Sequence, residues 1–372
     1  IGVGALLVGL ISAGYFITEL AAAPAAGRLA DRHGYVRVLR WGTALGVLAM
    51  LSGAIAASGS LAVVVLAVLL LGARVTEGAS AACAVPTTLV LLAQSSAGDA
   101  LRRFRVMGVF EITSLLGLIA GFGLAGVAWH ALGAGAFLIL PAPYVAAWLL
   151  TLGTGSRAEH RIGALPPWRS ILTLIGRQTS VPFAFAWLAV NAVVGVWFQQ
   201  APFLLKLPTR SSTQALVGGY SAATIGLIFT AWGVTFLTGI TLWSLFAPRW
   251  ARRRILALAL GGMLLVVVSL ALVNHGAPRI VLAVGVLGIL IESGFAPAAF
   301  AYLADVTDSI TDARGALMGF YAFLLAAGQL AGAALGSPFA ARWQMDGVLA
   351  VTTVLAAVAL GSVAAMPAKA RT

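Results

Sequence analysis

The stretch GRLADRHGYVRVLR, residues 27–40, carries four arginines, an aspartate and a histidine between two long apolar runs of the chain. Each flanking run is long enough to cross a bilayer as a helix, which takes about 20 mostly apolar residues. Gly27 and Gly34 allow a sharp turn and a close approach of the backbone. The stretch therefore predicts a loop at the membrane surface between two spanning helices.

The composition places the whole chain in a bilayer. Of its 372 residues, 61% are hydrophobic and 9% are charged, whereas soluble domains carry roughly 25% charged residues. The runs lack the alternation of a transmembrane β-barrel, and hydrocarbon admits only helices or closed barrels. We predict an all-α integral membrane protein whose spans follow the apolar runs 2–26, 38–57, 61–95, 105–128, 134–153, 181–205, 218–246, 254–273, 280–304, 315–337 and 347–366.

The positive charges distinguish the two sides of the membrane. Of the 23 lysines and arginines, 18 fall in one set of alternating loops and the C-terminal tail, four fall in the other set, and Arg74 lies within a run. This is the positive-inside pattern. It predicts a multi-pass protein of the cytoplasmic membrane with residues 27–40 and the C-terminus in the cytoplasm. The net charge of +12 therefore does not indicate a nucleic-acid partner.

An internal repeat explains the odd number of runs. Residues 27–40 align with SLFAPRWARRRILA, residues 244–257, at an offset of 217, with Pro248 in the place of Asp31. Met107-Gly108 aligns with Met318-Gly319 at an offset of 211. The repeat predicts two halves of six helices, with the first helix absent from this chain. The expected parts are an N-terminal bundle in 1–153, a cytoplasmic linker in 154–180, and a C-terminal bundle with a short tail in 181–372.

Residues 27–39 resemble the signature of the major facilitator superfamily, which reads roughly G-x-L-A-D-R-x-G-R-K-x-x-L. Tyr35 and Val36 depart from it, because the family usually has basic residues there; Arg37 and Arg40 can stand in for them. The positions that match are Gly27, Leu29, Ala30, Asp31, Arg32, Gly34 and Leu39.

Two weaker motifs also resemble patterns of that family. Residues 74–78, R-V-T-E-G, are similar to R-x-x-Q-G, with Glu77 in place of the glutamine. Residues 117–126 are similar to the motif of the drug–proton antiporters, G-x-x-x-G-P-x-x-G-G, but Phe122 replaces its proline and Ala125 one of its glycines. The resemblance covers essentially the whole chain and implies two pseudo-symmetric six-helix bundles, with helices 2 to 12 present here.

The resemblance also implies a gate. In this interpretation Asp31 meets the start of the eleventh helix, near residues 312–315, and holds the two halves together, because an anion is stabilised at a helix N-terminus. The alternative is a surface pair of Asp31 with Arg32 or Arg37, worth about 0–1 kcal/mol. The residues of this gating motif are Gly27, Asp31, Arg32, Gly34 and Arg37.

Ionisable side chains within the runs are candidates for ion coupling, because an intramembrane charge costs about 2.5–3.5 kcal/mol even on lenient scales. Glu19 and Glu292 lie near mid-membrane and are proposed to carry protons or cations; the alternative is a protonated helix contact. Arg74 and Glu77 share a helix face and form either a coupled pair or a permanent ion pair. Glu111 is expected to be neutralised by Arg102, Arg103 and Arg105.

Other side chains suggest a substrate cavity and close helix packing. Aromatic and amide groups suit a broad amphipathic substrate, and they occur in the second half at Asn191, Trp197, Gln199, Gln200, Tyr220 and Trp232; the alternative is an interfacial aromatic belt with interhelical hydrogen bonds. Small residues allow helices to cross closely, which predicts packing between the halves at Gly117, Gly121, Gly328 and Gly332. The histidines lie in loops or at run ends, so we expect no metal, cofactor or catalytic residue.

The function indicated is secondary active transport of a small molecule by alternating access. Four acids against one arginine within the runs favour protons and organic cations, so the first hypothesis is proton-coupled efflux of amphipathic or cationic compounds by a monomer. Uptake of a metabolite by symport, or lipid flipping, is the alternative within this class. A transporter-like receptor, or a membrane-embedded enzyme, is the alternative from other classes.

Overall fold

The computed structural model describes residues 2–57, 63–153, 181–208, 213–247, 250–308 and 314–366. These residues form helices and no strand, and nine segments of the described chain are long and apolar enough to cross a membrane. This confirms the prediction of an all-α membrane protein. The predicted linker 154–180 and the end of the tail lie outside the described residues.

The segment 27–40 is mostly helical, contrary to the expected loop. The first helix continues through its charges to His33, and the second begins at Tyr35. Gly34 alone makes the turn, with a φ of +95°, and its N–H donates to the Ala30 carbonyl at 2.8 Å. The helices of this part of the chain are α1 (Gly2–His33), α2 (Tyr35–Ala57), α3 (Val63–Ser95), α4 (Ala100–Leu132), η1 (Gly133–Leu138) and α5 (Pro141–Gly153).

The remaining helices include one that is interrupted inside an apolar run. The run 280–304 is divided at Ser293 and Gly294, where Gly294 weakens the helix and Pro297 has no N–H for the Ser293 carbonyl. The helices are α7 (Val181–Lys206), α8 (Ala222–Phe246), α9 (Arg252–Asn274), η2 (Arg279–Val281), α10 (Leu282–Glu292), α11 (Phe295–Asp308) and α12 (Arg314–Ala364).

The last helix, α12, contains both of the final predicted runs. Its 51 residues would extend about 77 Å if they were straight, far more than the roughly 30 Å of a bilayer core. Gln344 has non-helical φ and ψ of 53° and −129°. Gly347 then packs against the backbone of Phe339, so the two arms of α12 turn back on each other, as the two separate runs predicted.

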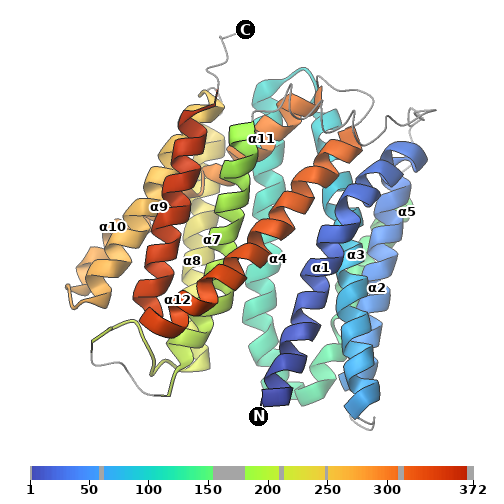
Figure 1. The fold of residues 1–372 in the computed structure, drawn as a ribbon. Coiled ribbons are helices and arrows are strands. Elements are labelled where there is room, and N and C mark those ends of the chain that lie inside the picture. The colour runs from blue at the N-terminus through green and yellow to red at the C-terminus, as the bar shows by residue number, and fades with distance from the viewer. Residues whose placement is uncertain are drawn as a thin grey trace. The chain divides into compact units, whose positions relative to one another are not determined.

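The described chain forms two compact units, each containing segments of both sequence halves. Unit 1 comprises the described residues within 1–95, 124–153 and 306–326, and α3 packs against both α1 and α2 in it. Unit 2 comprises the described residues within 96–123, 181–305 and 327–366, and α10 packs against α8 and α9 in it. Figure 1 shows these neighbouring helices by label. The boundaries expected for the two bundles stay a prediction.

Candidate functional site

Asp31 is buried at the end of α1. Its side chain is 3% exposed, and the Tyr35 hydroxyl donates to Oδ1 at 2.7 Å. Arg32 and Arg37 are exposed, and among the described residues neither forms a salt bridge with Asp31. The surface pair considered as an alternative is therefore not formed. Gly27 is buried within α1, and Gly34 makes the turn that follows.

The first turns of α12 pack on α1 within unit 1. A methyl group on Gly319 would lie 2.5 Å from the Ala23 carbonyl oxygen, and Ala322 belongs to a buried cluster with Ala23 and Ala26. Because successive spans alternate in direction, the end of α1 and the start of α12 lie on the same side of the membrane. Residues 312 and 313, predicted to meet Asp31, lie outside the described chain.

The repeat relates this contact to a second one. Gly108, the equivalent of Gly319, packs on Ser244 and Ile240 of α8 in unit 2. At the offset of 217, Ile240 is the equivalent of Ala23, so both Met-Gly pairs contact equivalent helices. Met107 and Met318 are fully buried beside these glycines. These contacts join helices from different sequence halves.

An ion-pair cluster that the sequence reasoning missed lies in unit 2. Arg103 Nη1 is 2.5 Å from Asp305 Oδ1, and Arg252 Nε is 3.7 Å from Asp305 Oδ2. The guanidinium of Arg252 also lies over the Phe104 ring, 4.9 Å from its centroid. The available signal was the acid Asp305, which directly follows the apolar run 280–304. We call Arg103, Arg252 and Asp305 the Asp305 cluster.

A polar cluster in unit 1 contains three of the predicted coupling residues. Glu19 is 4% exposed and hydrogen-bonded to Tyr15, one turn earlier in α1. In α3, Arg74 Nη1 lies 2.8 Å from Glu77 Oε2, and its guanidinium lies 5.6 Å from the Tyr15 ring centroid. Helices α1 and α3 come this close because Gly78 packs on the backbone of Tyr15 and Glu19.

Glu111 and Glu292, in unit 2, have no such neighbours. Neither forms a salt bridge or side-chain hydrogen bond among the described residues. The expected neutralisation of Glu111 is not seen, because even Arg105, the nearest of the three arginines, lies about 9 Å away along α4, and Arg103 is paired with Asp305. Glu292 is the last residue of α10, at the interruption of that span.

Of the six predicted cavity residues, all described, Trp232 lines an apolar pocket. Four of the others bond within the protein. Asn191 donates to the Trp187 carbonyl at 2.8 Å, Trp197 to Thr352 Oγ1 at 3.0 Å, and Gln200 to Ser337 Oγ at 2.9 Å. The Tyr220 hydroxyl donates to the Ala215 carbonyl at 3.3 Å, near the end of the 207–221 connection, and Gln199 is exposed.

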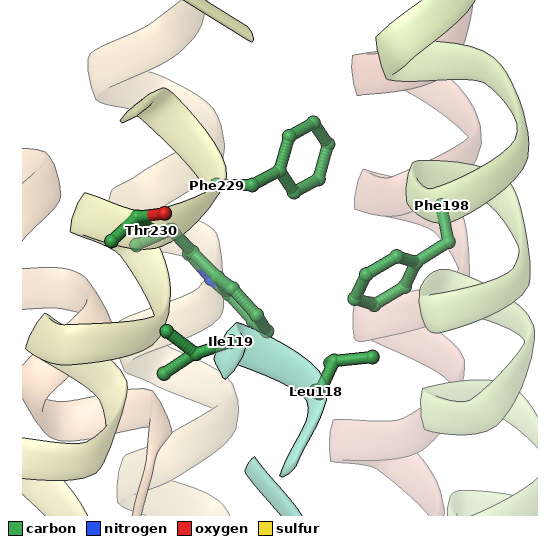
Figure 2. Close-up of a pocket in the computed structure, with 6 residues that line it drawn as sticks. Leu118, Ile119, Phe198, Phe229 and Thr230 are labelled. Carbon is green, nitrogen blue, oxygen red and sulfur yellow. The ribbon is translucent and has the colours of Figure 1, made fainter. Parts of the chain in front are cut away.

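The pocket with Trp232 lies between α4, α7 and α8 and is almost entirely apolar. Its rings are close: Phe198 lies 5.9 Å from Phe229 and 5.8 Å from Trp232 between centroids. Figure 2 shows Phe198 and Phe229 on opposite sides of the pocket, with Leu118 and Ile119 on α4. Its free volume is about 10 Å³, room for about one water molecule, so a ring or alkyl group would fit only if these side chains moved apart.

The four predicted packing glycines behave differently. Gly328 and Gly332 pack on the backbone of α7, where a methyl group on Gly328 would lie 2.6 Å from the Leu188 carbonyl oxygen. This is a contact within the second half, not the expected one between halves. Gly117 and Gly121 have no neighbour within 4 Å of an added methyl group, which differs from the expectation because α4 makes its close crossing at Gly108.

The structure is similar to solved transporters at low sequence identity. The human organic anion transporter MFSD10 (TETRAN) superposes with a TM-score of 0.71 at 19% identity, covering 95% of this chain and 82% of that protein. The E. coli fucose:proton symporter FucP gives 0.71 at 16%, covering 96% and 90%. The proton:xylose symporter XylE gives 0.69 at 16%, covering 96% and 85%. At such identities the likeness shows the fold.

Comparisons of the sequence identify the family. A search among curated proteins gave no match. The sequence profile described as Major Facilitator Superfamily matches residues 1–217 and again residues 217–371, which together span the chain. The two matches, the fold and the motif at residues 27–39 agree. The chain belongs to the major facilitator superfamily.

Proposed function

We propose that this protein is a proton-coupled secondary transporter that exports amphipathic or cationic compounds by alternating access. The observation that carries the proposal is the set of carboxylates within the apolar runs: Glu19, Glu77, Glu111 and Glu292 against the single arginine Arg74. Glu111 and Glu292 have no charged or hydrogen-bonding partner among the described side chains. Acids within membrane spans that have no such partner are suited to binding and releasing protons.

The charge balance also favours the class of substrate. Three of the four acids are not paired with a cation, so in their ionised form they would repel an organic anion entering among the spans and attract a cation. MFSD10, an organic anion transporter by name, shares the fold, but at 19% identity its substrate is not a guide to this chain. The proposed substrate therefore carries a positive charge.

The aromatic pocket supports an apolar body for that substrate. Its lining offers three aromatic rings and one hydroxyl, that of Thr230. A sugar needs many hydrogen-bonding partners, because polar groups buried without them cost free energy. A ring or alkyl group needs none and gains from burial. Trp232, Phe198 and Phe229 are therefore proposed to hold the apolar part of an amphipathic compound.

The gate is proposed to lie at the end of the helices that carries residues 27–40, which we place in the cytoplasm by the charge pattern. Asp31, buried and bonded to Tyr35, is proposed to meet the start of α12. The Asp305 cluster ties α4 to α9 and α11 at the same side. Breaking both contacts would open the cytoplasmic side in each cycle.

The protein is further proposed to act as a monomer in the cytoplasmic membrane and to catalyse no chemical reaction. The test is accumulation by purified protein in proteoliposomes, with and without an imposed pH gradient. The probes are labelled amphipathic cations, hydrophobic anions of similar size, and sugars. Cations should move in response to the gradient, while anions and sugars should not. Gradient-driven movement of sugars or anions with cations static would overturn the substrate class.

A further inference from the structure

The interruption between α10 and α11 leaves two carbonyl oxygens without their usual helical donors. The Gly294 N–H, which would bond Leu290 in a continuous helix, instead reaches Ile291 at 3.3 Å. The Ile291 carbonyl in turn lacks the usual bond from Phe295, where a new helix begins. Such groups cost free energy inside a membrane unless another donor satisfies them.

Two side chains supply donors here: Ser293 Oγ donates to the Leu290 carbonyl at 2.8 Å, and Trp243 of α8 donates to both carbonyls. Its indole N–H is bifurcated, with Nε1 3.0 Å from the Leu290 oxygen and 3.1 Å from the Ile291 oxygen. Its ring lies directly on Gly294, where a methyl group would be only 2.6 Å from Cε2. The side chain of Trp243 therefore contacts the interruption between α10 and α11 through both a hydrogen bond and its ring.

Two glycines, one on α8 and one on α9, pack against the backbone at the end of α10. On α8, a methyl group at Gly239 would lie 2.8 Å from the Leu290 oxygen. On α9, a methyl group at Gly262 would lie 2.6 Å from the Glu292 nitrogen. The backbone that carries Glu292 thus packs against α8 and α9, and Trp243 is the side chain that contacts the interruption from α8.

The surroundings of Glu292 contain few other charges. Helix α8 has no ionisable residue, and α10 has none besides Glu292. On α9 the nearest are Arg252, Arg253 and Arg254, the last about 12 Å along the helix from Gly262. Asp305 lies about 20 Å along the span.

Helix α7, which reaches this region through the ring contact of Trp187 with Phe295, carries only Lys206, about 28 Å along the helix from Trp187. None of these groups is near enough to neutralise the carboxylate of Glu292. A change in its charge must therefore be accommodated by the backbone of the break itself.

We propose that Trp243 is the positioning residue of Glu292: its indole N–H fixes the break that presents the carboxylate, and it moves when that carboxylate gains or loses a proton. The proposal rests on the coupling role proposed for Glu292. It also favours a proton over a metal cation, because the freed carbonyls that a metal ion would need as ligands are already bonded to Trp243.

The alternative is that Trp243 only caps the break and is indifferent to Glu292. The protein labelled with 5-fluorotryptophan and studied by ¹⁹F NMR in detergent separates the two without any substrate. The resonance of Trp243 is identified by its absence from W243F, and that of Trp250 by its absence from W250F. Trp250 is the internal control, since it is 45% exposed and lies 6.0 Å from Trp243 between ring centroids.

In the wild-type protein the Trp243 resonance should shift between acid and alkaline pH, and the shift should be lost in E292Q. If E292Q fails to fold, E292D, which moves the carboxylate by one methylene, should displace the midpoint of the titration. A Trp243 resonance that does not titrate in the wild type, or that titrates unchanged in E292Q or E292D, overturns the proposal. Transport independent of a pH gradient, with the resonance titrating as expected, would instead contradict the coupling function alone.

Discussion

Arg103 and Asp305 lie 202 residues apart in the sequence and form an ion pair with 2.5 Å between Nη1 and Oδ1. Arg103 lies in the first turn of α4, in the first sequence half, and Asp305 lies in the last turn of α11, in the second. The Arg103 side chain is 7% exposed and that of Asp305 24%. With Arg252 nearby, one carboxylate compensates two guanidinium groups at the side that we propose to be cytoplasmic.

Asp305→Asn should destabilise the protein, because it leaves two largely buried arginines without their carboxylate. Breaking a buried pair costs about 3–5 kcal/mol, and the partial exposure of Asp305 reduces this to roughly 2 kcal/mol. Thermal unfolding in detergent would measure it. Arg102→Ala, which removes the exposed neighbouring arginine, is the control and should have little effect. Equal unfolding temperatures for the wild type and Asp305→Asn would show that the cluster contributes nothing.

Asp31→Asn should abolish most transport while leaving insertion and folding intact, because the proposed gate needs the negative charge at the start of α12. Tyr35→Phe removes the hydroxyl bonded to Asp31 at 2.7 Å and should reduce transport less. Asp99→Asn is the matched control: Asp99 caps α4 through the Arg102 N–H at 2.9 Å, and asparagine caps equally well. Wild-type rates in Asp31→Asn would exclude the gating role.

Substitution by alanine should destabilise the protein at the packing glycines that lie against another helix, and should not do so at those without a neighbour. Gly328→Ala forces a methyl group against the backbone of α7, so it should lower stability by about 1–3 kcal/mol. Gly121→Ala meets no neighbour and should be neutral or stabilising by up to about 1 kcal/mol, since alanine favours helix. Unfolding by denaturant in detergent compares them. Similar losses at both positions would mean that α4 has a close partner at Gly121.

Two tryptophans predicted to line the same cavity should differ in their effect on transport. Trp232→Leu alters the aromatic pocket and should raise the KM for an aromatic cation with a smaller change in kcat. Trp197→Phe removes the bond to Thr352, which lies in the packed interior, and should lower stability without changing selectivity. Transport kinetics with an aromatic and an alkyl cation would distinguish them. An unchanged KM in Trp232→Leu would place the substrate elsewhere.

The sequence predicted the helical class and most of the spans because their signal is local. Long apolar runs specify membrane helices by composition, and residues three apart on a helix, such as Arg74 and Glu77, must share a face. The turn at Gly34 was also foreseen, although its neighbours are helical. The single glycine Gly34, at positive φ, joins α1 directly to α2. The charged residues on either side of it therefore lie within these two helices.

Partners that are distant in sequence could not be predicted in this way. Nothing local to Arg103 indicates Asp305, and nothing near Trp243 indicates the carbonyls of Leu290 and Ile291. The repeat did contain part of the answer, because it aligned Gly108 with Gly319. Only the three-dimensional contacts showed that these glycines, and not Gly117 and Gly121, are where α4 and α12 cross helices of the other half.

The central claim is that intramembrane carboxylates couple substrate movement to protons. The most direct test is to add a transported cation to proteoliposomes that contain a pH-sensitive dye and to record proton movement in the wild type, Glu19→Gln, Glu292→Gln and the control Asp99→Asn. The account predicts a pH change with substrate in the wild type and Asp99→Asn, and its loss in Glu19→Gln or Glu292→Gln. Substrate movement without any proton movement in the wild type, or unchanged proton movement in both glutamine variants, would contradict it.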